Sequence, residues 1–240
     1  MAFFSLGKKF VNPLKIDLHS HLLPGIDDGS QSMEESIKII RRFKELGYTK
    51  LITTPHIMPH AYPNTKSIIN QKLYELREVL EKENIDIIIE AAAEHYVDTD
   101  FKDLLAKDGV LPFAGKFLLF ETEYNSKPLI LDDAIFDMQH KGFIPTLAHP
   151  ERYYYLHNNF ENYYRLKEMG VLFQLNIKSF RSKTAPIYKI ALRLAKEGLV
   201  DFVGSDAHRI NDVKEMEFLS HSKMYKMIFE KNRILNMDVL

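Results

Sequence analysis

The sequence predicts an α/β fold, a barrel of seven strand–helix units, and two observations support this expectation. Short apolar runs alternate with stretches of helical periodicity along most of the 240 residues, which indicates a parallel sheet with right-handed crossovers. Six of the seven apolar runs also end on a histidine, an aspartate or a glutamate. Because the carboxyl ends of the strands in such a barrel meet at one rim, these side chains are expected to form one site.

The expected strands are short and mostly apolar. The run Ile87-Ile88-Ile89 is apolar throughout, as expected for a strand in a sheet that is covered on both faces. Seven units within residues 15–204 are compact but sufficient for a closed barrel. The strands are placed at residues 15–19, 50–54, 85–91, 116–121, 143–148, 171–176 and 200–204.

Helices are expected between the strands. Ser32-Met-Glu-Glu35 has the form of a capping box, and apolar residues at helical spacing follow it as far as Gly47. A second helix contains Ile69, Leu73, Leu76 and Leu80, and further helices are predicted at residues 131–141, 159–169 and 186–197. All 240 residues are assigned to one domain, with residues 1–14 as an N-terminal arm and residues 211–240 as a helical tail.

Composition excludes several classes of protein. The net charge of −1 gives no overall basic field for nucleic acid. No apolar stretch approaches the roughly 20 residues that a membrane span needs. The first ten residues lack the features of a signal peptide, so the cytoplasm is the expected location. The sequence has no cysteine, which excludes disulfides, thiolate metal sites and cysteine nucleophiles.

Nine side chains near the predicted strand ends are candidate metal ligands. Two of them, His19 and His21, share one face of the first strand. Histidine, aspartate and glutamate without cysteine suit Zn²⁺, Mn²⁺ or Fe²⁺. Polar residues often mark strand ends in any protein, but that alternative does not explain why only metal-binding types occur. The nine are His19, His21, Asp28, His56, Glu94, Glu121, His149, Asp206 and His208.

Two arginines are candidates for binding an anionic substrate. Arg152 lies three residues after His149, and its guanidinium matches phosphate oxygens in a bidentate manner. A salt bridge between Arg152 and Glu151, or another carboxylate, is an equally good interpretation of these residues. Arg209, next to His208, is the second candidate. Tyr124 and residues 153–155, all tyrosines, are expected either to line an aromatic pocket or to pack in the core.

The motifs together resemble the polymerase-and-histidinol-phosphatase (PHP) superfamily. Its marks here are Asp17-Leu-His19-Ser-His21, Asp27-Asp28-Gly29, Thr54-Pro55-His56, His149-Pro-Glu-Arg152 and Gly204-Ser-Asp206-Ala-His208. Within it, the chain is most similar to the bacterial capsule-type, manganese-dependent protein-tyrosine phosphatases. The resemblance covers roughly residues 15–210.

This resemblance implies a distorted (β/α)7 barrel that holds three divalent metal ions, with manganese the expected metal and iron or zinc the alternatives. His19, His21, Glu94 and Asp206 would hold the first ion. Asp28, His56 and His208 would hold the second, and Glu94, Glu121 and His149 the third. Arg152 matches the phosphate-binding arginine of the family, whereas the segment after His208 departs from the family pattern and leaves the role of Arg209 open.

The implied activity is hydrolysis of phosphotyrosine on a protein, with a tyrosine kinase that controls capsule or exopolysaccharide synthesis as the expected partner. Two alternatives remain. One is a small-molecule phosphomonoesterase such as a histidinol-phosphate phosphatase. The other is a metal-binding domain without enzymatic activity, which the intact set of nine ligands disfavours.

Overall fold

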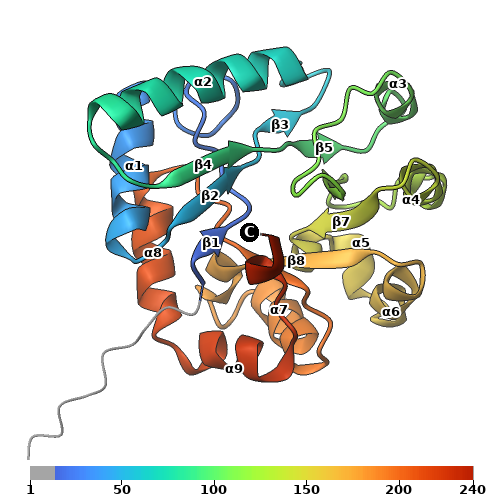
Figure 1. Ribbon diagram of the computed structural model, residues 1–240. Helices are drawn as coiled ribbons and strands as arrows, with labels where there is room; N and C mark the ends of the chain where they lie inside the picture. The colour runs from blue at the N-terminus through green and yellow to red at the C-terminus, as the bar shows by residue number, and fades with distance from the viewer. Residues whose placement is uncertain (1–13, 240) are drawn as a thin grey trace, which may run out of the picture.

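The chain folds as a β/α barrel with its helices outside the ring of strands (Figure 1), and the computed structural model describes residues 14–239. Every strand pair is parallel. The predicted fold class is therefore confirmed. The strands are β1 (Ile16–Asp17), β2 (Lys50–Thr53), β3 (His56–Ile57), β4 (Ile88–Ala91), β5 (Glu94–Tyr96), β6 (Phe117–Glu121), β7 (Ile144–Ala148), β8 (Leu172–Asn176) and β9 (Phe202–Gly204).

The strands follow one another around the barrel in sequence order. The strands form two hydrogen-bonded sheets. One sheet has the order β1-β2-β4, and the other has the order β3-β5-β6-β7-β8-β9. The two ends of this arrangement meet where Ser20 pairs with Ala207. There the backbone N–H of His21 donates to the carbonyl of Ala207 at 2.9 Å, and that of Asp206 donates to the carbonyl of His19 at 2.7 Å. We call this pairing of residues 19–21 with residues 206–207 the seam.

Two of the seven expected strands are each followed by a short further strand that was not predicted. β2 stops before Pro55, which has no N–H to donate to a ladder, and the chain resumes as β3. β4 and β5 are likewise separated, at residues 92–93. β3 and β5 pair so that His56 lies opposite Glu94. The breaks between β2 and β3 and between β4 and β5 thus separate the two sheets, and the pairing of β3 with β5 places the candidate ligands His56 and Glu94 side by side.

One predicted boundary was wrong. The third strand was expected to begin at residue 85, but β4 begins at Ile88. The N–H of Ile85 instead donates to the carbonyl of Leu80 at 2.9 Å, which closes the end of the preceding helix. Residues 85–87 therefore complete a helix terminus before the chain enters the sheet.

The helices between the strands bury their apolar faces against the barrel. The helices are α1 (Met33–Glu45), α2 (Lys66–Lys82), α3 (Phe101–Ala106), α4 (Leu131–His140), α5 (Tyr154–His157), α6 (Glu161–Glu168), α7 (Pro186–Lys196), α8 (Ile210–Ser220) and α9 (Lys223–Lys231), with short 3-10 helices η1 (Pro150–Arg152), η2 (Ile177–Phe180) and η3 (Asn236–Val239). The short helices α3 and α5 were not predicted. Both have one or two turns, too few for a periodic signal.

The start of α1 largely follows the prediction. Ser32 is the N-cap, and its hydroxyl accepts a hydrogen bond from the N–H of Glu35. The carboxylate of Glu35 accepts from the N–H of Gln31 at 2.9 Å, one residue before the donor that a capping box uses. Both side chains still satisfy backbone donors that would otherwise have no partner at a helix N-terminus.

The interior of the barrel is apolar at the end away from the candidate site. Phe113, Phe117 and Phe202 pack against one another there, together with Ile16. The last 3-10 helix, η3, lies near the barrel axis in Figure 1 and adds Val239 to this cluster. Side chains rather than an open channel therefore fill this end of the barrel, as is usual in β/α barrels.

The C-terminal helices pack on the barrel. α8 contacts α1, and α9 contacts α7. Within the predicted helical tail, Met216, Leu219 and Ile228 are buried, and Met224 and Met227 pack partly buried against the core. The predicted arm lies outside the described residues except for Leu14, which is buried. Among residues 14–239, no helix is long and apolar enough to cross a membrane.

Candidate metal centre

The structure brings all nine predicted ligands to one rim of the barrel. Each belongs to at least one group of side chains whose ligand atoms lie within 4.8 Å of one another. Seven of the nine are buried, whereas Asp28 is exposed and His208 is partly exposed. Asp28 and His208 therefore lie on the solvent side of the site. Burying this many ionisable groups together is costly unless charges are paired or bind an ion.

The first group surrounds the seam. Nε2 of His19 lies 3.2 Å from Oε2 of Glu94 and 3.6 Å from Oδ1 of Asp206. Nε2 of His21 lies 3.4 Å and 3.6 Å from the same two oxygens. Two imidazoles and two carboxylates thus present four atoms to one small volume, which matches the set predicted for the first ion.

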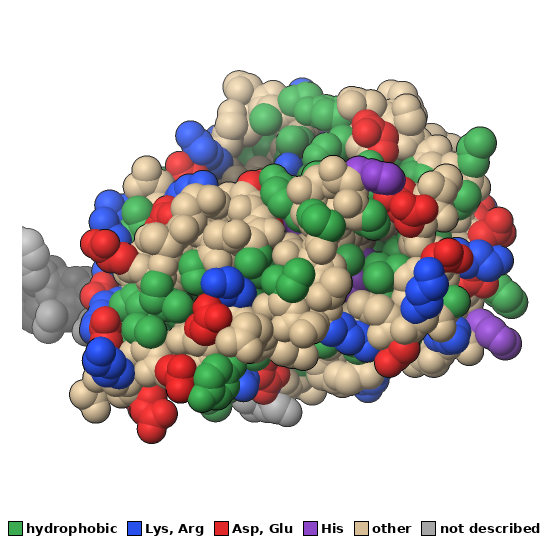
Figure 2. Space-filling view, turned by 90° about the horizontal axis from the view of Figure 1, so that it is seen from above, with side chains coloured by type: hydrophobic (Ala, Val, Ile, Leu, Met, Phe, Trp, Pro, Cys, Tyr) green, Lys and Arg blue, Asp and Glu red, His purple; other side chains and the backbone are tan. Residues whose placement is uncertain are grey.

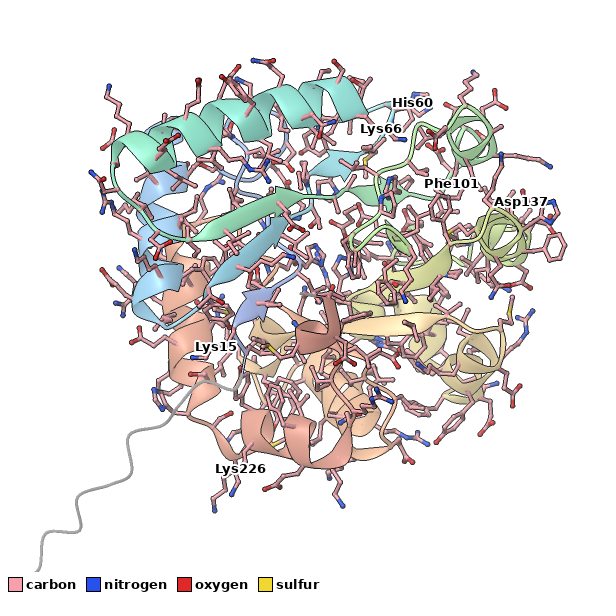
Figure 3. The ribbon with its side chains drawn as sticks, viewed as in Figure 1. Lys15, His60, Lys66, Phe101, Asp137 and Lys226 are labelled. Carbon is pink, nitrogen blue, oxygen red and sulfur yellow. The ribbon has the colours of Figure 1, made fainter. Side chains whose placement is uncertain are left out.

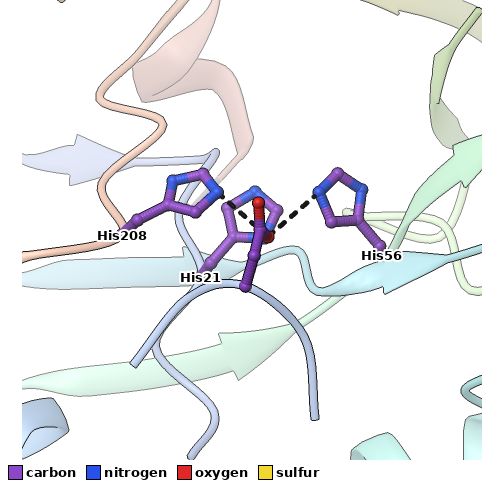
Figure 4. A group of neighbouring side chains, drawn as sticks. His21, His56 and His208 are labelled. Carbon is purple, nitrogen blue, oxygen red and sulfur yellow. Dashed lines mark ion pairs between the residues drawn. The ribbon is translucent and has the colours of Figure 1, made fainter. Parts of the chain in front are cut away.

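The second group lies at the exposed side of the rim. Oδ1 of Asp28 lies 3.3 Å from Nε2 of His208 and 3.4 Å from Nε2 of His56, and dashed lines mark these two ion pairs in Figure 4. His21 lies between these histidines and stacks on His208 with ring centroids 4.1 Å apart. This group contains the three residues predicted for the second ion.

The residues predicted for the third ion are distributed over two overlapping groups that share Glu94. Oε1 of Glu94 lies 2.8 Å from Nε2 of His149. Oε1 of Glu121 lies instead 2.9 Å from Nδ1 of His56, and neither of these two buried atoms makes a hydrogen bond. Unpartnered donor and acceptor atoms in a buried site are expected where a metal ion would satisfy them. The residues present therefore fit a metal centre, and the division of ligands among ions stays a prediction.

Electrostatics within the cluster hold its carboxylates ionised. Burial would raise the pKa of Glu94, but His19 and His56 outweigh burial and hold that pKa well below its usual range. Burial likewise opposes the ionisation of Asp206, yet Lys178 and the neighbouring histidines lower its pKa. For His21, burial is outweighed by hydrogen bonds to Asp27 and Glu94, which raise the pKa to about 9. In the metal-free protein, protons therefore occupy imidazole nitrogens that must be deprotonated before they can bind a metal ion.

Side chains behind the ligands fix their orientation. Asp27 accepts from Nδ1 of His21 at 2.8 Å and from the N–H groups of Gly29 and His56. Asp27 is not among the nine predicted ligands. Its position shows a further role, because a carboxylate on one ring nitrogen directs the other nitrogen toward the metal position.

Two residues of β8 were missed by the sequence analysis. Oε1 of Gln174 accepts from Nδ1 of His19 at 2.6 Å, and its amide donates to Asn176 at 2.9 Å. The Asn176 amide in turn donates to Oδ2 of Asp206 at 2.7 Å. These two residues link ligands on both sides of the seam. The signal that could have revealed them is the pair of amide side chains at alternate positions in an otherwise apolar strand.

Two glycines leave space for this arrangement. A Cβ on Gly204 would lie 2.6 Å from Nε2 of Gln174 and 2.8 Å from Cβ of His19. A Cβ on Gly29 would lie 2.3 Å from the carbonyl oxygen of His21. All three distances are far below van der Waals contact, which explains why glycine stands in each of these motifs.

An open cavity of about 430 Å³ lies over the metal centre and is lined by both predicted arginines. NH1 of Arg152 lies 3.3 Å from Oδ2 of Asp206, and its guanidinium lies 4.7 Å above the Tyr124 ring. Glu151 instead accepts from the N–H of Asn176 and the hydroxyl of Ser179, and burial raises its pKa to about 7. Arg152 therefore does form an ion pair with a carboxylate, as the alternative expected, but the partner is Asp206 and not Glu151, and the guanidinium also lines the cavity.

Arg209 lies at the start of α8 with its guanidinium held by the protein. NH1 donates to the carbonyls of Gly29 and His208. Nε lies 3.5 Å from Oε1 of Glu35. The side chain lines the cavity, and its part in chemistry stays a prediction.

Some of the tyrosines and remaining histidines line the cavity, and others pack in the core or lie at the surface. Tyr124 lines the cavity, whereas Tyr153 is fully buried in the core. His95 is also buried, and its ring contacts the carbonyl of Leu119 and the N–H of Leu111. His60 lies at the surface near α3 (Figure 3), where it approaches Asp100 at 3.4 Å. Neither histidine joins the cluster, as expected.

Similarity to known proteins agrees with this reading. The family model for capsular polysaccharide synthesis, CpsB/CapC, matches residues 15–230. Tyrosine-protein phosphatase YwqE of Bacillus subtilis (strain 168) is 31% identical over 212 residues, which are 88% of this chain and 82% of that protein. Tyrosine-protein phosphatase CpsB of Streptococcus pneumoniae is 27% identical over 203 residues, with coverage of 82% and 84%.

Two solved structures show similar folds. One belongs to a study of YwqE from Bacillus subtilis and CpsB from Streptococcus pneumoniae, described as unique metal-dependent tyrosine phosphatases. It matches with a TM-score of 0.79 and 28% identity, over 90% of this chain and 91% of that one. The histidinol phosphate phosphatase of Lactococcus lactis matches with a TM-score of 0.56 and 16% identity, over 89% and 93% of the two chains.

Fold and site together define a β/α-barrel protein with a candidate polynuclear metal centre. Within that class, the chain belongs to the CpsB/CapC family of capsular polysaccharide synthesis. The resemblance noted in the sequence is thereby confirmed.

Proposed function

We propose that this protein is a metal-dependent protein-tyrosine phosphatase. The observation that supports the proposal most directly is the convergence of nine metal-type ligands beneath a cavity lined by Arg152. The relatives at 27% to 31% identity over most of the chain are named tyrosine-protein phosphatases. The sequence contains no cysteine that could act as a nucleophile.

Three divalent ions, with manganese the expected metal, are part of the proposal. The first ion would be held by the group at the seam, the second by Asp28, His56 and His208, and the third by Glu94, Glu121 and His149. Divalent ions at such a site would supply Lewis acidity and activate water for hydrolysis near neutral pH. Support comes from the buried donor set and from its unpartnered atoms on His56 and Glu121.

Side chains of the protein bind and orient the substrate in this proposal. Arg152, fixed by Tyr124 and Asp206, binds the phosphoryl oxygens and stabilises the charge that builds on them in the transition state. Asp27 and Gln174 hold the histidine rings in position. A tyrosine leaving group has a pKa of about 10, so departure of the phenolate requires little help from a general acid.

The expected substrate is phosphotyrosine on a bacterial tyrosine kinase that controls capsule or exopolysaccharide synthesis. The description of the family supports the link to capsular polysaccharide. The open position of the cavity at the barrel rim suits a phosphorylated protein segment better than a small metabolite, which favours an enclosed pocket. The kinase as partner and a cytoplasmic location rest on the resemblance and on the sequence.

A comparison of substrates tests this function. The metal-reconstituted protein is assayed with phosphotyrosine peptide, phosphoserine peptide and histidinol phosphate at equal concentration. We expect the highest kcat/KM for phosphotyrosine peptide. A large preference for histidinol phosphate would assign the chain to the small-molecule alternative. Absence of turnover on every phosphomonoester, with metals bound, would support a domain without enzymatic activity.

A further inference from the structure

We propose that Lys178 is a second phosphoryl-binding cation, which acts beside Arg152 on the same substrate group. The inference rests on the proposed function and assigns a role to a residue outside the predicted site. Lys178 belongs to η2, directly after β8. β8 is the one predicted strand that ends without a metal ligand.

The position of the ammonium supports this role. Nζ of Lys178 donates to the carbonyl oxygen of Asp206 at 2.6 Å and lies 3.1 Å from its Oδ2. NH1 of Arg152 lies 3.3 Å from that same Oδ2. The two cationic groups therefore lie close together, one from η2 after β8 and the other from η1 after β7, and one phosphoryl group is able to reach both.

Donor groups remain for a ligand. An ammonium has three N–H groups, and the contacts of Lys178 with Asp206 use two of them. The side chain is 25% exposed. Lys178 lines the cavity over the metal centre and also the adjoining cavity of about 240 Å³, which Arg152 shares. A free donor is thus available on the substrate side of the site.

The single negative charge of Asp206 does not neutralise the positive charges of both Arg152 and Lys178. One carboxylate oxygen accepts from Arg152 and the Asn176 amide and lies 3.1 Å from Nζ of Lys178, while the other oxygen faces His19 and His21. Two full positive charges therefore share part of one negative charge. A phosphate monoester dianion would supply the missing negative charge at this position.

The segment that holds Lys178 is fixed on both sides. Oε1 of Glu151 accepts from the N–H of Asn176 at 3.0 Å and from the hydroxyl of Ser179 at 2.6 Å. Glu151 is fully buried and lies in the same short motif as Arg152. The motif that presents the arginine therefore also anchors the backbone around the lysine, which is the kind of support that a preorganised binding site needs.

Arg209 is less suited to the same task. Its NH1 donates to two backbone carbonyls, and its Nε approaches Glu35 at 3.5 Å. These contacts hold the guanidinium against the loop that contains Gly29 and the start of α1. Of the two cations, Lys178 has the closer relation to Arg152 and to Asp206.

The test uses the metal-loaded full chain and two variants of the lysine. Lys178→Met removes the charge at similar length, and Lys178→Arg restores it. Lys183→Met is the matched control, because Lys183 lies on the following segment and lines neither cavity. Affinity for inorganic phosphate is measured by calorimetry, and kcat and KM are measured with a chromogenic aryl phosphate. Metal content and Tm are measured for each variant.

We expect Lys178→Met to weaken phosphate binding about tenfold or more, as loss of a hydrogen bond to a charged group predicts. Metal content and Tm should stay at wild-type values, and Lys178→Arg should recover most of the affinity. Unchanged phosphate affinity in Lys178→Met would overturn the assignment. Loss of metal and a lowered Tm in both Lys178 variants would also overturn it, since Lys178 would then only support Asp206.

The two proposals fail in different ways. If the wild-type protein binds phosphate through Lys178 but hydrolyses no phosphomonoester, the proposed function is wrong and the role of Lys178 as an anion-binding residue stands. If aryl phosphate is hydrolysed and Lys178→Met has wild-type kcat, KM and phosphate affinity, the function stands and the role of Lys178 is wrong.

Discussion

Nδ1 of His19 lies 2.6 Å from Oε1 of Gln174, in a buried hydrogen bond between residues 155 positions apart in the sequence. The bond places the ring proton on Nδ1 and leaves Nε2 free to face Glu94. β8 thus has no ligand of its own and instead orients a ligand on β1.

Replacing Gln174 should weaken metal binding without preventing folding. Gln174→Leu keeps the size of the side chain but removes the acceptor for His19 and the donor to Asn176. We expect metal affinity to fall about 10-fold to 100-fold, as is common when such a supporting residue is lost. Competition with a chelator measures the affinity. Gln139→Leu, at an exposed amide on α4, is the control. Wild-type affinity in Gln174→Leu would show that the hydrogen bond is dispensable.

Elemental analysis should approach three divalent ions per chain, because nine ligands meet at one rim. His149→Ala should remove most activity and leave the fold intact, since rim residues are separate from the packed barrel interior. His140→Ala, on the outer helix α4, should change neither property. A firm maximum of one ion in the reconstituted wild-type protein would contradict the trinuclear centre.

Chelation should abolish activity, and thiol alkylation should not affect it. The first expectation follows from the ligand set, and the second from the absence of cysteine in the sequence. The measurement is turnover of an aryl phosphate before and after dialysis against chelator, followed by readdition of Mn²⁺. Full activity in protein shown to be free of metal would rule out the metal mechanism.

Arg152→Lys should lower turnover clearly. The substitution keeps the charge but loses the bidentate fork and the stacking on Tyr124. We expect a loss of about tenfold or more in kcat/KM, which corresponds to roughly 1.4 kcal/mol of transition-state stabilisation. Arg165→Lys, at an exposed ion pair, is the control. If Tm drops sharply while the folded enzyme keeps normal turnover, Arg152 is structural instead.

The metal-free protein should lose stability as the pH rises from about 7 to 9. The pKa of His21 is raised to about 9, because hydrogen bonds to Asp27 and Glu94 outweigh burial. A group with a raised folded-state pKa stabilises fully below its unfolded pKa of about 6.5 and loses that contribution as pH rises through the folded value. Thermal unfolding at both pH values measures the effect.

Bound metal should prevent this loss of stability at high pH. Metal ligation requires neutral imidazole, so higher pH favours the loaded form. The metal-loaded protein should therefore keep its Tm, or gain, over the same range. Equal pH dependence of the loaded and metal-free proteins would show that protons and metal do not compete at this site.

The sequence predicted the fold and the ligand positions because both depend on local signals. Periodicity located the strands and helices, and ligands such as His56 and His149 directly follow apolar runs. Parallel pairing then brings strand ends together without further information. The charged surface also follows from composition: acidic and basic side chains are intermixed over the face in Figure 2, as the net charge of −1 suggests.

What the sequence could not supply is how side chains pair across the barrel. The sequence left open which carboxylate Arg152 contacts, and the fold brings this residue to Asp206, 54 positions away. Lysine and glutamine do not by themselves indicate a functional site, so Lys178 and Gln174 were not predicted. The strands β3 and β5 were missed because they have only two and three residues.

The seam has a consequence for the integrity of the whole barrel. Its ladder is short, and it joins segments from opposite ends of the described chain. His19 and His21 lie on one side of the seam and Asp206 on the other, so an ion bound to all three would link the two ends of the barrel. Removing that ion would then do more than stop chemistry. It would weaken the link between the two ends of the barrel, and the amide hydrogens of His21 and Asp206 would exchange with solvent faster than those of the β6–β7 ladder.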